Sequence, residues 1–147
     1  MEAKFSPRVK DVLSFSREEA VRLGNDFISV EHLLLGAIRE GEGKAITFLN
    51  RLGINLAMVR KDIESELSKM AILSPNNINV KANIPLVKQA EKVLKFMYLE
   101  AKVYQSTQIG TEHLLLSMLK IEDCFACKIL NKYGVIYDNI AKYMENS

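Results

Sequence analysis

Residues 28–35 read Ile-Ser-Val-Glu-His-Leu-Leu-Leu, and residues 109–116 read Ile-Gly-Thr-Glu-His-Leu-Leu-Leu. The two stretches are 81 residues apart, and the same offset aligns residues 12–54 with residues 93–135 without a gap. Fifteen of these 43 aligned positions are identical. A fixed internal offset of this kind indicates a duplicated structural unit, so the chain is predicted to fold as two equivalent halves.

Each half is predicted to contain four helices. In the first half, Ser6 as the N-cap and Pro7 at the first helical position begin a helix that continues to about Leu23. Apolar residues recur with a helical period in this segment and in its copy. Gly24 and Gly53 end helices, and Asn55 caps one. The predicted helices cover about 7–23, 30–40, 43–52 and 55–70 in the first half, and about 85–104, 111–121, 124–132 and 136–145 in the second.

The expected fold class is all-α. No segment alternates between apolar and polar residues for long enough to indicate a sheet. The helices that begin with Glu-His-Leu-Leu-Leu are apolar on nearly all sides, which is typical of buried central helices. A polar breaker cluster at 74–77 indicates a linker. We therefore expect a single domain over 1–147, with about eight helices in two pseudo-symmetric four-helix repeats, 5–70 and 84–145, joined by a linker at 71–83.

The composition is that of a globular protein, with 48% hydrophobic and 26% charged residues. Twenty Lys and Arg against eighteen Asp and Glu give a net charge of +2, which argues against a dedicated nucleic-acid binder. Residues 1–10 resemble neither a signal nor a transit peptide, and no apolar run is long enough to span a membrane. Cys124 and Cys127 are too few for a disulfide framework. We expect a cytoplasmic protein that contacts neither nucleic acid nor membrane.

Five segments carry a resemblance to a known family, namely residues 16–24, 28–36, 39–45, 49–54 and 110–116. They resemble the Clp N-terminal repeat, and Arg-Glu-Gly-Glu-Gly at the start of 39–45 is more similar to ClpC than to ClpA or ClpB. The resemblance implies a domain that precedes two AAA+ ATPase modules, which unfold proteins and thread them into the ClpP peptidase. It also implies that adaptor proteins and tagged or unfolded substrates are the partners, and that the domain itself performs no chemistry.

The sequence contains no phosphate-binding loop of the Walker A type. That motif needs Gly-Lys-Ser/Thr at a fixed distance after its first Gly, but Gly41 is followed by Glu42, and Gly43-Lys44 is followed by Ala45, which has no hydroxyl. We therefore expect no cofactor in this domain. By the resemblance, ATP and magnesium belong to the ATPase modules, which also build the family's hexamer, so the isolated domain is expected to be a monomer.

The second copy of the motif begins a helix with Thr111 and Glu112. Free backbone N–H groups and the positive end of the helix dipole attract an anion there, while the carboxylate can bind a guanidinium. The resemblance implies docking of phosphoarginine-tagged substrates through the acidic residue of the motif, which gives Glu31 and Glu112. The alternative is that a first-turn Glu only complements the helix dipole, an effect of roughly 0.3 to 1 kcal/mol.

The two copies differ in the residues around these glutamates. Thr111 is expected to cap its helix, whereas Val30 cannot, and Ser29 is expected one position too early. At the start of the fifth helix, Val87 replaces a hydroxyl of the family pattern, while Ser6 in the first copy retains one. The second copy is therefore the stronger candidate. The predicted ligand-binding residues, by resemblance, are Ser6, Ser29, Val30, Glu31, Thr111 and Glu112.

Other chemistries have weaker support in the sequence. His32 and His113 are each followed by three leucines, which favours buried, hydrogen-bonded core residues over a catalytic base. Cys124 and Cys127 have redox or zinc spacing but no second pair, which favours packing over metal binding. Two alternative functions remain open. One is a free-standing Clp-repeat adaptor or decoy without an ATPase, and the other is a small helical hydrolase that uses one of the histidines.

Overall fold

The computed structural model describes residues 3–72 and 84–146, and in these ranges the chain forms eight helices and two very short strands. The expected all-α class is confirmed. The first half contains β1 (Lys4–Phe5), α1 (Pro7–Arg22), α2 (Val30–Glu40), α3 (Lys44–Arg51) and α4 (Leu56–Ser68). The second half contains α5 (Lys88–Val103), β2 (Gln108–Ile109), α6 (Thr111–Lys120), α7 (Phe125–Lys132) and α8 (Tyr137–Glu145). The predicted linker lies outside the described residues except for residues 71 and 72.

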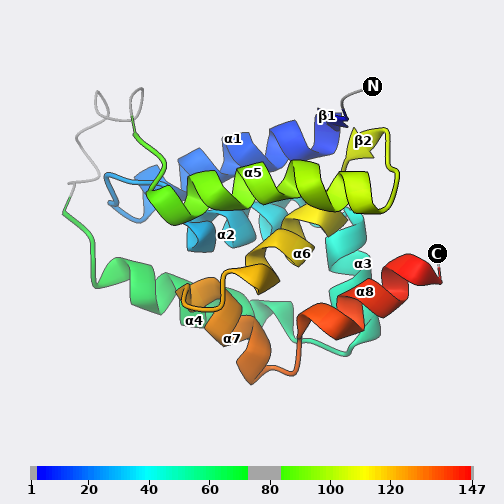
Figure 1. Cartoon of the computed structure of the whole chain (residues 1–147). Coiled ribbons are helices and arrows are strands. Elements are labelled where there is room, and N and C mark those ends of the chain that lie inside the picture. Colours follow the sequence, from blue (N-terminus) through cyan, green and yellow to red (C-terminus); the bar gives the residue numbers. More distant parts are fainter. Residues whose placement is uncertain (1–2, 73–83, 147) are drawn as a thin grey trace.

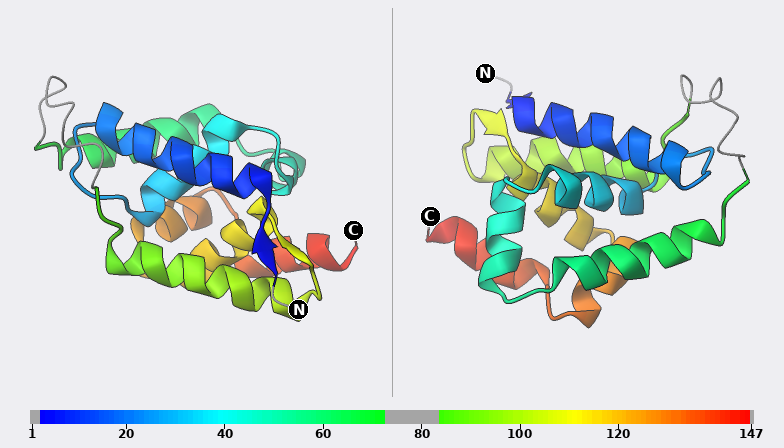
Figure 2. Two further views of the ribbon diagram at one scale, coloured as in Figure 1. Left: turned by 90° about the horizontal axis from the view of Figure 1, so that it is seen from above. Right: turned by 180° about the vertical axis from the view of Figure 1, so that it is seen from behind.

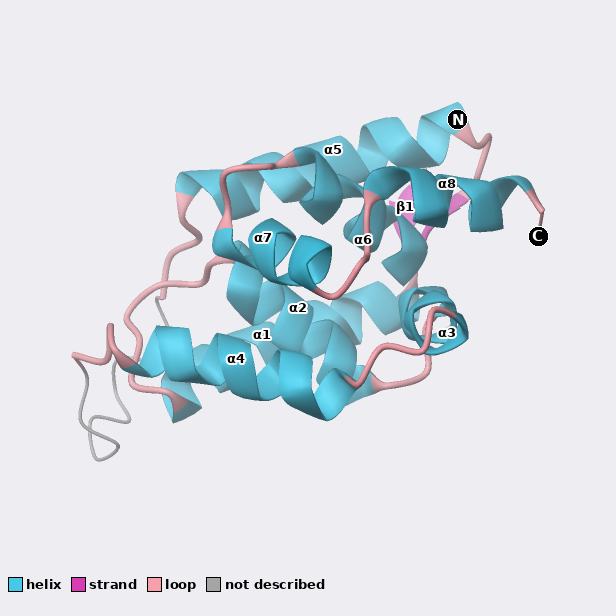
Figure 3. Ribbon diagram, turned by 90° about the horizontal axis from the view of Figure 1, so that it is seen from below, coloured by secondary structure: helices cyan, strands magenta, loops and turns pink. Residues whose placement is uncertain are grey.

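The helices are arranged in three levels. The long helices α1 and α5 run along one side of the molecule, with α2 and α6 beneath them (Figure 1). The views from above and from behind show the same arrangement (Figure 2). On the opposite side lie α4 and α7, and α3 and α8 lie together at one end of the molecule (Figure 3). None of the described helices combines the length and apolar character that crossing a bilayer requires.

The core is built around α2 and α6, as the apolar character of both helices predicts. The leucines that follow each His are at most 2% exposed, and they are Leu33, Leu34, Leu35, Leu114, Leu115 and Leu116. Helix α2 lies in contact with α1, α4 and α7, and α6 lies in contact with α5, α3 and α8. The two motif helices therefore hold both repeats in one hydrophobic core.

The strands join the two repeats. Strand β1 pairs in parallel with β2, so that Phe5 lies opposite Ile109. An isolated bridge pairs Ile28 with Leu86, which are the equivalents of Ile109 and Phe5 by the 81-residue offset. The entry to the long helix of each repeat therefore lies beside the motif of the other repeat. These pairs were not predicted, because two residues are too few to show a strand's alternation.

Candidate functional site at the start of helix α6

The residues that begin the two motif helices differ from the sequence expectation. Ser29 is the N-cap of α2, and its hydroxyl accepts the N–H of His32, so it does not lie one position too early. In the second copy Gly110 is the N-cap, and Thr111 is the first residue inside α6. The expectation that Thr111 caps its own helix is therefore wrong. The extended backbone reaches the cap position at Gly110, one residue before Thr111. Because Gly110 has no side chain, it cannot accept an N–H of the first turn of α6.

Both motif histidines are structural, as the sequence predicts. His32 is fully buried, and its Nδ1 accepts the N–H of Ser29 at 2.9 Å. The neutral ring therefore carries its proton on Nε2 and donates it to Asn25 Oδ1 at 2.8 Å. His113 repeats the pattern, because its Nδ1 accepts the N–H of Gly110 at 2.9 Å. Burial lowers the pKa of His32 to about 4 and also lowers the pKa of His113. Such rings hold helix starts in place and are poor bases at neutral pH.

Glu31 caps a helix of the other repeat. Its Oε2 accepts the N–H of Ala126 at 2.8 Å, in the first turn of α7. The residue is 9% exposed, and burial raises the pKa of its carboxyl while the Ala126 N–H opposes that rise. Val30, beside it, is buried and apolar. Because its carboxylate is occupied inside the protein, Glu31 is poorly placed to receive a ligand.

Thr111 of the second repeat caps a helix of the first repeat, as Glu31 of the first repeat caps α7 of the second. Its Oγ1 accepts the N–H of Ala45 at 3.1 Å, in the first turn of α3, and Ala45 is equivalent to Ala126 by the repeat offset. A Cβ added to Gly43 would lie 2.2 Å from Thr111 Oγ1, so the start of α3 approaches α6 as closely as a glycine allows. The hydroxyl of Thr111 thus accepts an N–H at the start of α3, whereas the carboxylate of Glu31 accepts the equivalent N–H at the start of α7.

This exchange leaves Glu112 without a structural N–H partner among the described residues. Its polar contact is an ion pair with Lys44, whose Nζ lies 3.9 Å from Glu112 Oε2. The Lys44 side chain is 59% exposed, so the pair is weak and easily rearranged. A Cβ on Gly110 would lie 2.1 Å from Glu112 Oε1, which places the carboxylate over the bare Cα of the helix start. A carboxylate and an ammonium therefore lie together where the α6 dipole is positive.

Ser6 belongs to this same site and not to that of Glu31. Its backbone N–H donates to Ile109 O at 3.0 Å, which places the start of α1 beside the start of α6. Its hydroxyl accepts the N–H of Val9, and among the described residues no acceptor takes its own proton. Val87 occupies the equivalent place near Ile28, where its N–H donates to Ile28 O. The predicted residues thus separate into two composite sites, each built from both repeats.

Sequence reasoning missed Lys44. It begins α3 directly after Gly43, and its equivalent at the start of α7 is the apolar Phe125. The signal was present in the alignment, because a charge that appears in only one copy is not required by the duplicated fold. At the site of Glu31, apolar Val87, Val30 and Phe125 stand where Ser6, Thr111 and Lys44 stand at the site of Glu112. Only the site at α6 combines both charges with a hydroxyl.

The two cysteines pack in the core. Cys124 is the N-cap of α7, and its sulfur accepts the N–H of Cys127 at 3.4 Å. Both residues are at most 2% exposed, and burial raises the pKa of Cys124 to about 11. Raised thiol pKa values make these cysteines weak nucleophiles. Within residues 3–72 and 84–146, no three His, Cys, Asp or Glu side chains gather as a metal site would require.

Sequence comparison extends these observations to known proteins. The chain matches the family described as "Clp repeat (R) N-terminal domain" over residues 4–133 and again over 86–146. It is 35% identical over 135 residues to the negative regulator of genetic competence ClpC/MecB of Bacillus subtilis (strain 168). It is equally similar to the chaperone protein ClpB of Oceanobacillus iheyensis, at 35% over 135 residues. These alignments cover 92% of this chain but only 16% of each relative, so the chain spans a small part of their length.

Solved structures share the fold. The N-terminal domain of Hsp104 from Candida albicans superposes with a TM-score of 0.74 at 19% identity, covering 96% of this chain and 89% of that one. The N-terminal domain of ClpD from Arabidopsis thaliana gives 0.72 at 21% identity, covering 97% and 92%. The duplicated motif, the eight helices of the described residues and the sequence matches together show that the chain belongs to the Clp repeat N-terminal domain family.

Proposed function

We propose that this domain docks substrates and adaptor proteins for an ATPase of the ClpC type, which unfolds them and passes them to the ClpP peptidase. Membership of the Clp repeat family supports this role, and the Arg-Glu-Gly-Glu-Gly segment at 39–43 supports the ClpC type. In this role the domain is a cytoplasmic binding module without a cofactor of its own, since ATP and magnesium act in the ATPase modules. The observation that carries the proposal is the pair of Glu112 and Lys44 at the start of α6.

Phosphoarginine suits the chemistry of this pair. Its guanidinium is bonded directly to a phosphoryl group, so positive and negative charge lie side by side. The carboxylate of Glu112 can accept N–H bonds from the guanidinium, and charge-assisted bonds of this type are the strong ones. Lys44 and the N–H groups of the first turn of α6, where Gly110 offers no side-chain cap, can receive the phosphate. The hydroxyl of Ser6, beside Ile109, supplies a further donor at the edge of the site.

Calorimetric titration of free phosphoarginine into the domain tests the proposal, with plain arginine as the control ligand. We expect saturable binding by the wild type, loss of binding in Glu112→Ala, and weakening in Lys44→Ala. Lys128→Ala is the matched control, because Lys128 is also exposed but begins no helix of this site. Equal affinity for arginine, or binding that survives in Glu112→Ala, would show that this site does not recognise phosphoarginine.

A further inference from the structure

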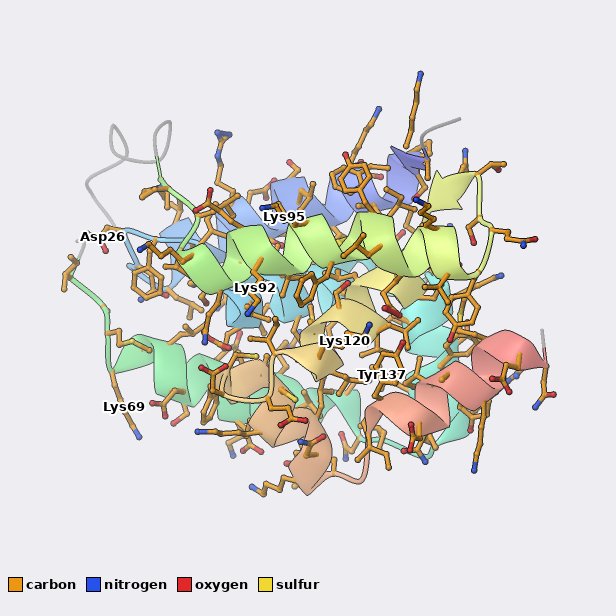
Figure 4. The ribbon with its side chains drawn as sticks, viewed as in Figure 1. Asp26, Lys69, Lys92, Lys95, Lys120 and Tyr137 are labelled. Carbon is orange, nitrogen blue, oxygen red and sulfur yellow. The ribbon has the colours of Figure 1, made fainter. Side chains whose placement is uncertain are left out.

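One face of α5 carries a stripe of lysines. Its residues are spaced by alternating intervals of four and three, which places them on the same side of a helix. We call this stripe the α5 lysine face, and it consists of Lys88, Lys92, Lys95, Leu99 and Lys102, all exposed. Figure 4 labels Lys92 and Lys95 on this helix. At 1.5 Å per residue, the stripe is about 21 Å long.

The lysines of this face have no ion-pair partner among the described residues. Elsewhere in those residues, seven basic side chains pair with acids, namely Arg8, Arg22, Arg39, Lys44, Lys69, Lys120 and Lys132. Others, such as Arg60, Lys128 and Lys142, have no ion pair but lie on separate helices, so the α5 lysine face differs in that its lysines form one row. The ammonium of Lys92 lies over the Phe96 ring, and this contact does not neutralise its positive charge. Helix α5 has two acids of its own, Glu91 and Glu100. Four positive charges therefore lie along one helix with little compensation.

Neither acid of α5 neutralises the stripe. Glu91 is exposed at the flank of the face, and no ion pair joins it to a lysine there. Glu100 is fully buried, and it binds Lys120 Nζ at 2.7 Å and the hydroxyl of Tyr137 at 2.6 Å. Lys120 and Tyr137 are labelled close together beneath α5 in Figure 4. The charge of Glu100 is therefore used inside the protein, away from the stripe.

The fold does not require these lysines. By the repeat offset, the equivalent positions on α1 are Pro7, Asp11, Ser14, Glu18 and Val21. This set contains no basic residue, although α1 occupies the matching place on the same side of the molecule (Figure 2). A row of like charges on one helix face also repels itself and costs stability. The stripe is thus a property of the second repeat alone, and a partner of opposite charge would offset its cost.

Apolar side chains accompany the charges. Leu99 is 54% exposed within the stripe, and Tyr98 beside it is 45% exposed. The C-terminal end of the stripe opens into a hollow of about 840 Å³ between α5, β1 and the segment before β2. Lys4 and Lys102 line this hollow together with Tyr98, Leu99 and residues 105–108. An apolar or aromatic side chain can enter it while carboxylates meet the lysines at its rim.

We propose that the α5 lysine face and the adjoining hollow bind an acidic segment of a partner protein, with an apolar or aromatic residue of that segment in the hollow. About six or seven extended residues, or four helical turns, match the length of the stripe. A hollow with exposed apolar neighbours suits a peptide side chain better than a flat lipid surface. This proposal rests on the proposed role in docking substrates and adaptor proteins, and it adds that one such partner is acidic. The surface that it uses, the α5 lysine face, does not include Glu112.

Fluorescence anisotropy with an acidic peptide tests the surface. The probe is a labelled Glu-rich peptide with a central Leu-Phe pair, and its control has Gln in place of every Glu. The charge-reversed variant carries Lys92→Glu, Lys95→Glu and Lys102→Glu. The matched control carries Arg60→Glu, Lys128→Glu and Lys142→Glu, which change the net charge equally from exposed positions on α4, α7 and α8. We expect the first variant to weaken binding about tenfold or more and the second to change it less than about threefold.

The two proposals fail in different ways. The lysine variant should keep its phosphoarginine titration, and Glu112→Ala should keep its affinity for the acidic peptide. Equal losses in both triple variants, or equal binding of the Gln peptide, would overturn the lysine face as a specific surface. So would lysine-dependent binding to phosphatidylserine vesicles or single-stranded DNA without binding to the acidic peptide. Weakening by added salt in the wild type alone would support it.

Discussion

At the scale of single residues, Glu31 and Glu112 align in the repeat but have different duties. Glu31→Ala leaves the buried N–H of Ala126 without an acceptor, so we expect it to lower the free energy of unfolding by about 1–3 kcal/mol. Glu112→Ala removes only a weak pair with exposed Lys44, so we expect a change below about 0.5 kcal/mol. Urea unfolding of both variants measures the difference. Similar losses in the two would mean that Glu112 is also structural.

The buried histidine predicts a pH dependence. The pKa of His32 is about 4 in the folded protein because burial disfavours its charged form, whereas the unfolded chain has the ordinary value of about 6.5. As pH falls through that window, the unfolded chain takes up a proton that the folded chain refuses, so stability is lost. Between pH 7 and pH 5 the loss from His32 is about 2 kcal/mol. An NMR titration of the ring with a midpoint near its ordinary value would contradict this.

Sequence reasoning selected both glutamates and favoured Glu112, but it did so on the expectation that Thr111 caps its own helix, which the structure contradicts. The partner of Glu31 is an N–H group 95 residues away in the other repeat, and no local pattern reports such a contact. The residue that precedes each glutamate, Val30 or Thr111, decides its role. Val30 has no acceptor for the start of α7, so Glu31 supplies one, whereas the hydroxyl of Thr111 serves α3 and leaves Glu112 free of that duty. The histidines were predicted correctly because their leucine-rich setting already indicated burial.

At the scale of helices, the pairs α1–α2 and α5–α6 are packed differently. A Cβ on Gly36 would lie 2.4 Å from Ser16 Oγ and 2.5 Å from Val12 O, so α2 approaches α1 closely. The equivalent residue in α6 is Ser117, whose hydroxyl donates to His113 O at 2.8 Å. We expect Gly36→Ala to cost about 1–3 kcal/mol by pushing the helices apart, and Ser117→Ala to cost less than about 1 kcal/mol. Thermal and urea unfolding would detect both, and a neutral Gly36→Ala would show that α1 can move.

Helix positions followed from local sequence signals. Ser6, Pro7 and Asn55 act in the structure as the sequence predicts, because caps are made within a few residues of the helix they begin. The pairing of β1 with β2 was not predicted, because its stability comes from a neighbouring repeat and not from its own two-residue sequence. The same reason explains the error at Thr111, whose hydroxyl caps α3 rather than its own helix.

At the scale of the whole molecule, the repeats depend on each other. Glu31 caps α7, Thr111 caps α3, and the backbone pairs at Phe5–Ile109 and Ile28–Leu86 cross between the repeats. Each half alone would expose the leucines of α2 or α6 and lose these contacts. We expect fragments 1–72 and 84–147 to be largely unfolded separately by circular dichroism, while the intact chain unfolds in one transition. A stable, cooperative fragment would show that the repeats are independent domains.

An NMR titration of phosphoarginine into the isotope-labelled domain tests most directly whether the start of α6 is the ligand site. The expected result is saturable amide shifts at Gly110, Thr111 and Glu112 and at Lys44, with Ser29 and Glu31 unchanged. The charges of Glu112 and Lys44 meet only in a weak ion pair that a ligand can replace, whereas the carboxylate of Glu31 accepts the N–H of Ala126. Shifts centred on Glu31, equal shifts at both motif starts, or no saturable shifts at Glu112 would contradict the assignment.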